Sequence, residues 1–186
     1  MTITTTDFAA LTGEYTFDVN HTRVGFVARH AMVTKVRGSF NTFTGSASID
    51  GERPENSSVR VTVEVDSVDT RNEMRDNHLR SNDFLDIANY PQITFTSTDV
   101  KHVGGNDFEV TGELTIKGVT NTVTLPLEYQ GSATDPFGNH RIGFEGSTVI
   151  NRTDFGVTYN AALETGGVLV GDKITLEFEV SAIKTA

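Results

Sequence analysis

The chain has no cysteine and few cations among its 186 residues. Without cysteine, a disulfide framework, a thiolate zinc site and a cysteine nucleophile are all excluded. There are 15 Lys and Arg residues against 25 Asp and Glu residues, so the formal net charge is −10. Such a charge repels phosphate backbones and anionic membrane surfaces. We therefore expect no nucleic acid partner.

The motifs of the common catalytic and metal-binding sites are also missing. The five histidines form no HExxH or short HxH pattern: they are His21, His30, His78, His102 and His140. There is no GxSxG elbow, and the glycines of HVGGNDF and TGGVLVG lie between strand-like segments, where no helix follows to cradle a phosphate. Asp76 and His78 are two residues apart, so on a helix they face different sides. The sequence predicts no metal, no cofactor and no assembled catalytic site.

No apolar run approaches the roughly 18 residues that a membrane helix needs, so we expect no membrane span. The N-terminal stretch MTITTTDFAALTG lacks the basic and apolar regions of a secretion signal, which predicts a cytoplasmic protein. A chain of this length fits one domain. We expect residues 1–13 to form an N-terminal tail and residues 14–186 to form that domain.

Most of the chain alternates apolar and polar residues with the period of a β-strand, as in SVRVTVEVD and KITLEFEV. About eight strands joined mostly by short turns account for the pattern, which fits either a closed barrel or a sandwich. Strands of about ten to twelve residues favour a barrel about 25 to 30 Å tall. Phe40 and Phe43 are three apart, so either a bulge separates them or one ring points outward. Pro126 suits an edge or a bulge better than a central ladder position.

One long segment, from Ser67 to Ser97, interrupts the strand pattern. It groups four apolar residues at spacings that make one side of a short helix: Met74, Leu79, Phe84 and Leu85. Tyr90 and Pro91 end any helix, because the residue before a proline is pushed toward extended geometry. We expect a helical insert over 75–90, beside or over one end of the β-structure. Alternating charges favour an ion-pair network that fixes it, formed by Arg75, Asp76, His78 and Arg80.

The order of several separated motifs resembles the YceI-like family of lipid-binding proteins. They are DVNHTRVGFVARH, GSFNTFTG, SVDT, RDNHLRSNDFLD, YP with ITFTS, GELTIKGVTNTV and NRTDFGV, and they extend from about Tyr15 to Ile183. The resemblance implies a single antiparallel lipocalin-like barrel with a short helical insert. It also implies a pore that holds a long apolar molecule, such as an isoprenoid, without chemistry.

The inward faces of the strands supply candidate pore-lining residues. They are Phe26, His30, Phe40, Val61, Val63, Phe84, Phe95, Leu114, Ile116, Phe144, Ile150 and Phe178. Composition alone favours a filled core for this set, and the resemblance reverses that preference in favour of a pore. Ala28, Gly112 and Gly146 lie on otherwise bulky faces, where they would leave space. His30 ends an apolar face, where it either satisfies a backbone carbonyl or contacts a ligand head group.

These observations favour a non-catalytic carrier or store for a long-chain lipid, such as a polyisoprenoid or an isoprenoid quinone. One alternative is a small hydrolase or isomerase that uses His30 or His78 at the barrel mouth as a base. Another is a structural or stress-related module with a filled core and no ligand. A homodimer is compatible with Pro126 and with outward apolar residues such as Val119.

Overall fold

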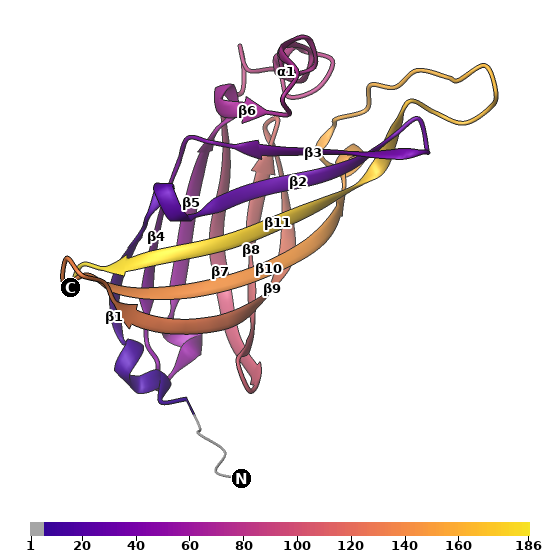
Figure 1. Cartoon of the computed structure of the whole chain (residues 1–186). Coiled ribbons are helices and arrows are strands. Elements are labelled where there is room, and N and C mark those ends of the chain that lie inside the picture. The colour runs from indigo at the N-terminus through magenta and orange to yellow at the C-terminus, as the bar shows by residue number, and fades with distance from the viewer. Residues whose placement is uncertain (1–5) are drawn as a thin grey trace.

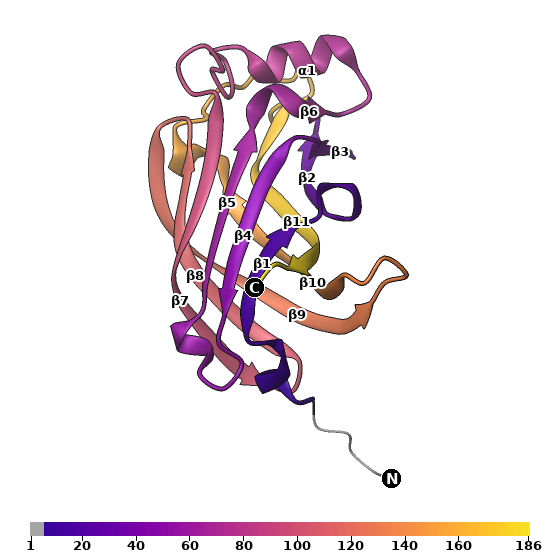
Figure 2. The ribbon, with the colours of Figure 1, turned by 90° about the vertical axis from the view of Figure 1, so that its left-hand side faces the viewer.

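The computed structural model describes residues 6–186, which form one closed antiparallel barrel with a short helix over one end (Figures 1 and 2). The strands are β1 (Gly13–Phe17), β2 (Arg23–His30), β3 (Thr34–Phe40), β4 (Phe43–Ile49), β5 (Ser58–Glu64), β6 (Val68–Asp69), β7 (Gln92–Gly104), β8 (Asp107–Ile116), β9 (Val119–Thr134), β10 (His140–Asn151) and β11 (Val170–Lys184). The helix is α1 (Glu73–Arg80), and 3₁₀ turns are η1 (Phe8–Leu11), η2 (Val19–His21), η3 (Pro54–Asn56), η4 (Val65–Ser67) and η5 (Arg152–Phe155). No helix of the described part is long and apolar enough to cross a membrane.

The eleven named strands make eight long barrel strands, called staves here, because β1 with β2, β3 with β4 and β5 with β6 each form a single bent strand. β1 and β2 both pair with β11, β3 and β4 run back along them, and β5 continues into β6 beside β4 and β3. The remaining strands pair with their sequence neighbours, and β1–β11 closes the ring. The predicted barrel of about eight strands with one helical insert is confirmed.

A kink between β3 and β4 explains how Phe40 and Phe43 can be three residues apart and both avoid solvent. Asn41 and Thr42 interrupt the stave, so Phe40 ends one strand and Phe43 begins the next. Phe40 lines the main cavity and Phe43 is buried. Neither ring points into solvent, because the alternation of inward and outward side chains begins again after the bend.

Toward the end that carries α1, the barrel wall divides into two facing sheets. The β9–β10 ladder stops at Glu128 and Glu145, and β3 pairs with β6 only through Ser39 and Phe40. Pro126 lies in the part of β9 beyond that ladder, which fits the expected edge position. In Figure 1, β10, β11, β2 and β3 lean away from β4, β5, β7 and β8, and beyond Glu128 β9 stays paired with β8. The fold is therefore a closed barrel at one end and an open sandwich at the other.

The opposite end is filled by a cluster of apolar and aromatic side chains. Its buried members are Leu11, Tyr15, Ala47, Tyr129, Ile142 and Ala182. The turn η1 packs here, since the Tyr15 hydroxyl donates to the Leu11 carbonyl (2.9 Å) and the ring of Phe8 meets that of Tyr129 (5.5 Å). Part of the predicted 1–13 tail thus covers the barrel, residues 1–5 lie outside the described residues, and the domain boundary at residue 14 stays a prediction.

Arg141 fastens the β9–β10 turn to the start of the barrel. Its guanidinium donates to Asp18 (2.5 Å) and Asp135 (2.8 Å). The bond from Arg141 is the main reason that the pKa of each carboxyl is held below its usual range, with His21 adding to the effect on Asp18 and Asn139 to that on Asp135. A carboxyl whose pKa is lowered by folding stabilises the folded state at neutral pH.

We expect Arg141→Gln to lower the melting temperature at pH 7 by several degrees. The difference from the wild type should shrink as the pH falls from 4 toward the lowered pKa values, because protonated carboxyls no longer need the cation. Thermal unfolding from pH 7 to pH 2.5 measures both effects. An equal loss at every pH would show that Arg141 acts through packing instead.

Candidate functional site

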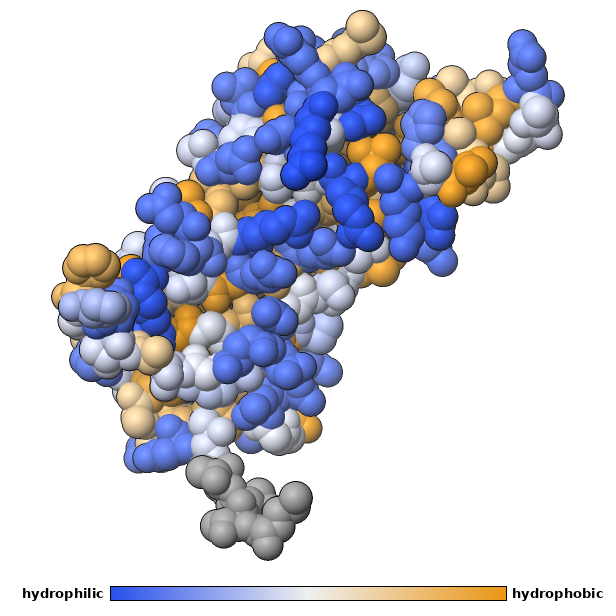
Figure 3. Space-filling view, viewed as in Figure 1, coloured by the Kyte–Doolittle hydropathy of each residue, from blue (hydrophilic) through white to orange (hydrophobic). Residues whose placement is uncertain are grey.

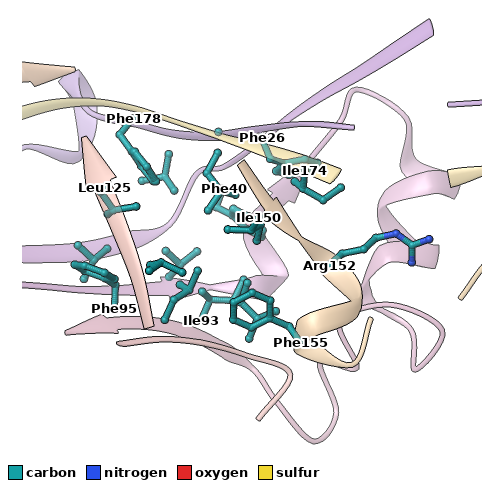
Figure 4. A pocket seen from close by; sticks show the side chains of 18 of the residues that line it. Phe26, Phe40, Ile93, Phe95, Leu125, Ile150, Arg152, Phe155, Ile174 and Phe178 are labelled. Carbon is teal, nitrogen blue, oxygen red and sulfur yellow. The ribbon is translucent and has the colours of Figure 1, made fainter. Parts of the chain in front are cut away.

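An apolar cavity of about 240 Å³ lies between the two facing sheets, beneath α1 (Figure 4). Its walls come from alternate residues of the strands, because successive side chains of a strand point to opposite faces. On β2 these are Val24, Phe26 and Ala28, and on the opposite sheet β5 contributes Val59, Val61 and Val63. Side chains from α1 and the residues after it, and from η5 and the residues after it, close the cavity at this end: Leu79, Phe84, Leu85, Phe155 and Val157.

Ten of the twelve predicted residues line this cavity. They are Phe26, Phe40, Val61, Val63, Phe84, Phe95, Leu114, Ile116, Ile150 and Phe178. Figure 4 shows Phe26, Phe40, Phe95 and Phe178 pointing into one space from different strands. Whether these side chains contact a ligand stays a prediction.

His30 lines neither this cavity nor the second one described below, which corrects one predicted position, whereas Phe144 lines the second cavity. His30 pairs with Thr34 and Val170 where β2 has left the barrel, and it is exposed. The alternation along β2 continues past the point where a lumen exists. Phe144 belongs to the opposite end, where its ring lies 5.5 Å from that of Tyr129.

A second cavity of about 100 Å³ continues the lumen toward that opposite end, and Phe144 is part of its lining. The two cavities share five lining residues, Phe17, Val59, Val110, Leu127 and Val180. These side chains form a constriction in one apolar passage. The lumen can therefore extend along the barrel axis if the constriction yields.

The expectation that small residues open the lumen holds only for Ala28. A Cβ at Gly112 would stand 2.5 Å from the Thr96 carbonyl oxygen, and one at Gly146 would collide with the Pro126 carbonyl oxygen. Both glycines allow close approach within the wall and are not among the cavity-lining residues. The added Cβ would also meet a cavity-lining side chain, Phe95 at Gly112 (2.6 Å) and Leu127 at Gly146 (2.8 Å), so larger residues there would disturb both the strands and the wall of the lumen.

Arg152 is the one charged residue that lines the larger cavity, and its guanidinium points away from the cavity (Figure 4). It donates to the carbonyls of Val157 (2.7 Å), Tyr159 (2.9 Å) and Gly171 (2.9 Å). The side chain is 5% exposed, and this burial lowers its pKa while Asp172 partly offsets the effect. Arg152 therefore holds residues 157–171 over the end of the barrel. We call these residues the cover and the hydrogen bonds of Arg152 the clasp.

The sequence reasoning missed this clasp and the cover that it holds. The motif NRTDFGV of the resemblance contains Arg152 without assigning it a role, and in the structure it forms a short turn. The turn is η5, whose N-cap Asn151 accepts from the Thr153 amide and whose last residue is followed by Gly156 at φ 74°. This short turn places Arg152 and Phe155, both buried, beneath the cover.

The insert that carries α1 is fixed by hydrogen bonds to its own approach strand. Asn72 caps the helix, and Asp76 accepts from the amide (2.9 Å) and hydroxyl (2.5 Å) of Thr70. Arg75 also binds Thr70, through its hydroxyl and its carbonyl (both 2.7 Å). The four residues of the predicted network do not pair with one another: Arg75 and Asp76 bind Thr70, whereas His78 pairs with Asp83 (2.8 Å) and Arg80 with Asp66 (3.4 Å).

His78 joins α1 to the cover made by residues 157–171. Its ring meets those of Phe84 (4.9 Å) and Tyr159 (5.0 Å), and its Nε2 lies 2.8 Å from an Asp83 oxygen. His78 is not among the cavity-lining residues. Over residues 6–186, no three His, Cys, Asp or Glu side chains gather where they could hold a metal ion.

Comparison with known proteins identifies the family of this barrel. The YceI-like domain matches residues 15–182. A UPF0312 protein of Pectobacterium atrosepticum is 42% identical over 152 residues, which cover 81% of this chain and 79% of that protein. The chain belongs to the YceI-like family.

Solved structures share the YceI-like barrel. BcnA of Burkholderia cenocepacia matches with a TM-score of 0.78 at 28% identity, covering 89% of this chain and 98% of that one. A polyisoprenoid binding domain from Saccharophagus degradans matches with a TM-score of 0.70, covering 92% and 98% of the two chains. At 17% identity, that second likeness shows the fold alone.

In this YceI-like barrel, we expect Arg152→Met to destabilise the protein by about 3 kcal/mol, because buried carbonyls lose their donor. Cleavage by a nonspecific protease should become faster within residues 157–171. Urea unfolding and mapped proteolysis measure the two effects. Arg152→Lys, which keeps the charge without the fork of donors, should fall between wild type and Met. Unchanged proteolysis in the Met variant would contradict the clasp.

Proposed function

We propose that this protein binds one long-chain apolar lipid, such as a polyisoprenoid or an isoprenoid quinone, inside the barrel and carries or stores it without chemistry. The main support is the chemical uniformity of the cavity. Apart from Gly25 and Arg152, whose charge is turned away, the lining side chains are all hydrocarbon. Such a surface stabilises an apolar chain and offers nothing to a polar substrate.

The size of the cavity favours a ligand over a filled core. A single water needs only about 10 to 15 Å³, whereas this cavity measures about 240 Å³ and continues into one of about 100 Å³. Native interiors are close-packed, so a space this large is not an ordinary packing defect. The alternative of a structural module with no ligand is therefore disfavoured.

Affinity would come from burying the chain and not from directed bonds. Each CH₂ removed from water contributes roughly 0.8 kcal/mol. Discrimination between chains would be weak, since a methylene more or less changes binding by only about 1 to 3 kcal/mol. The polar head would lie at the α1 end, where the cavity is covered by the insert and by residues 157–171. The Saccharophagus domain, which shares this fold, is described as polyisoprenoid binding, so the fold is compatible with this class of ligand.

The absence of a placed base argues against the hydrolase or isomerase alternative. His30 is exposed outside the barrel, and His78 is engaged with Asp83 and two aromatic rings. Neither imidazole faces the space where a substrate would lie. The cytoplasmic location and the homodimer stay predictions, to be tested by cell fractionation and by light scattering.

Native mass spectrometry and lipid extraction of the purified protein test the proposal. We expect one lipid per chain, or uptake of one molecule from a panel of quinones and polyprenols. Leu125→Trp should reduce uptake severalfold, because Leu125 points into the cavity (Figure 4) and the larger ring fills it.

The matched control is Thr124→Trp, on the adjacent and exposed position of β9. It should take up lipid like the wild type, with circular dichroism showing both variants folded. If neither the wild type nor the control takes up any lipid of the panel, the carrier function is rejected. If both variants bind equally, the lipid lies elsewhere.

A further inference from the structure

The β2–β3 hairpin projects beyond the barrel and ends in an apolar tip, defined here as Ala31, Met32 and Val33. Met32 is 64% exposed and Val33 is 75% exposed. Figure 1 shows the tip standing out beside residues 160–169, and Figure 3 shows apolar surface gathered over that projecting end. A soluble chain gains nothing from large apolar side chains at such a position.

The backbone of the tip is also strained. Ala31 and Met32 have φ values of 50° and 62°, and the Val33 amide donates to the His30 carbonyl (3.0 Å). Positive φ at two successive residues is the geometry of a type I′ turn, for which Asn and Gly are strongly preferred. Strain of this kind at side chains that contact water points to a role for those side chains.

The tip is held in place by the neighbouring cover. The Ala31 amide donates to the Leu169 carbonyl (2.7 Å), and the Met32 sulfur lies against Gly167, where a Cβ would stand. Asn160 fastens the same segment through both polar groups of Val170. Exposed Val168 adds to the apolar surface. The projecting end is thus a fixed apolar platform.

Cations flank this platform in an otherwise acidic protein. Arg29 and Lys35 are cross-strand partners just behind the tip, both exposed, and among residues 6–186 neither forms an ion pair. Arg37 follows on the same face, where Glu177 partly neutralises it (3.6 Å). Glu164 is the only acidic residue between Tyr159 and Val170. Asp172, two residues further on, has a 57% exposed side chain and pairs with Arg152 (3.5 Å). Since salt screens charges beyond about 8 Å, Arg29 and Lys35 give the tip a local positive charge despite the net charge of −10.

The tip adjoins the part of the wall that is not closed by hydrogen bonds. Residues 34–38 of β3 pair with β2 alone in the described chain, and the cavity lining includes Ala28 and Val170 close by. A surface that met the tip would therefore lie next to the covered end of the lumen.

We propose that the β2–β3 tip docks on the surface of an anionic lipid bilayer. Met32 and Val33 enter the boundary between head groups and acyl chains, while Arg29 and Lys35 bind lipid phosphates. Docking goes beyond the carrier function and does not require the lumen to be occupied. It would bring the covered end of the lumen against the membrane.

The chain contains no tryptophan, so a single one introduced at the tip is a specific reporter. Val33→Trp should show a blue-shifted and stronger emission when vesicles of phosphatidylcholine with phosphatidylglycerol are added. Pure phosphatidylcholine vesicles should give a much smaller change. The control is Val103→Trp, which places the reporter on another hairpin at a 52% exposed valine and should not respond.

Two further variants separate docking from folding. Ala31→Asn with Met32→Gly relieves the turn, so it should raise the melting temperature yet weaken vesicle binding roughly tenfold. Arg29→Glu with Lys35→Glu should weaken binding more than about 25-fold, since each cation near an anionic surface changes the partition roughly fivefold. Lys101→Glu on the β7–β8 hairpin is the charge control and should bind normally.

Three results would overturn the proposal. In the first, Val33→Trp does not respond to anionic vesicles, or responds no more than Val103→Trp. In the second, the variant with Ala31→Asn and Met32→Gly binds anionic vesicles as tightly as the wild type. In the third, the Val33→Trp emission shifts with protein concentration in the absence of vesicles, which would make the tip a contact between two copies. Lipid content is measured separately, so these failures are distinct from failure of the carrier function.

Discussion

The fold depends on β11, which is hydrogen-bonded along both of its edges. One edge pairs with β10 over eleven residue pairs, from Arg141 to Asn151, and the other pairs first with β2 and then with β1. The last strand thereby closes on the first two, so no cooperative barrel exists before nearly the whole chain is present. Because these pairings join the two ends of the sequence, they are costly in loop entropy and are expected to form late. Every inward face acquires its common lumen only through this closure.

The same closure explains why the lumen is widest at one end. β1 and β4 complete the ring around the first half of the barrel, where Tyr15, Tyr129 and Ile142 pack closely. At the other half the stave bends at Asn41 and Thr42, β3 loses its partner, and β9 separates from β10. Apolar faces that no longer meet across the axis cannot fill the space with side chains. A cover must then close it, and the α1 insert and the segment clasped by Arg152 provide one.

Much of this could be predicted from the sequence because strand alternation is a local signal. The inward orientation of Phe26, Val61 and Phe95 is predicted by the alternation of only a few neighbouring residues. The break in that alternation at the insert is equally visible over a short stretch of sequence. The errors arise where the outcome depends on tertiary position. His30 follows the alternation of β2 but lies where β2 has passed the end of the lumen. Arg152 gives no periodic signal at all, since its partners are backbone carbonyls that only the folded cover brings near.

The contacts that hold the cover in place lie together at the covered end of the barrel. The cover is joined to the barrel by Arg152, to α1 through Tyr159 and His78, and to the β2–β3 tip through Leu169 and Gly167. The closed half has a continuous ladder, whereas this half relies on side-chain bonds and a few backbone contacts, so local opening costs less here. A long apolar chain can enter a covered lumen only if some part of the wall moves. The cover contacts the tip through Leu169 and Gly167, so a surface that engaged Met32 and Val33 would act directly on the cover.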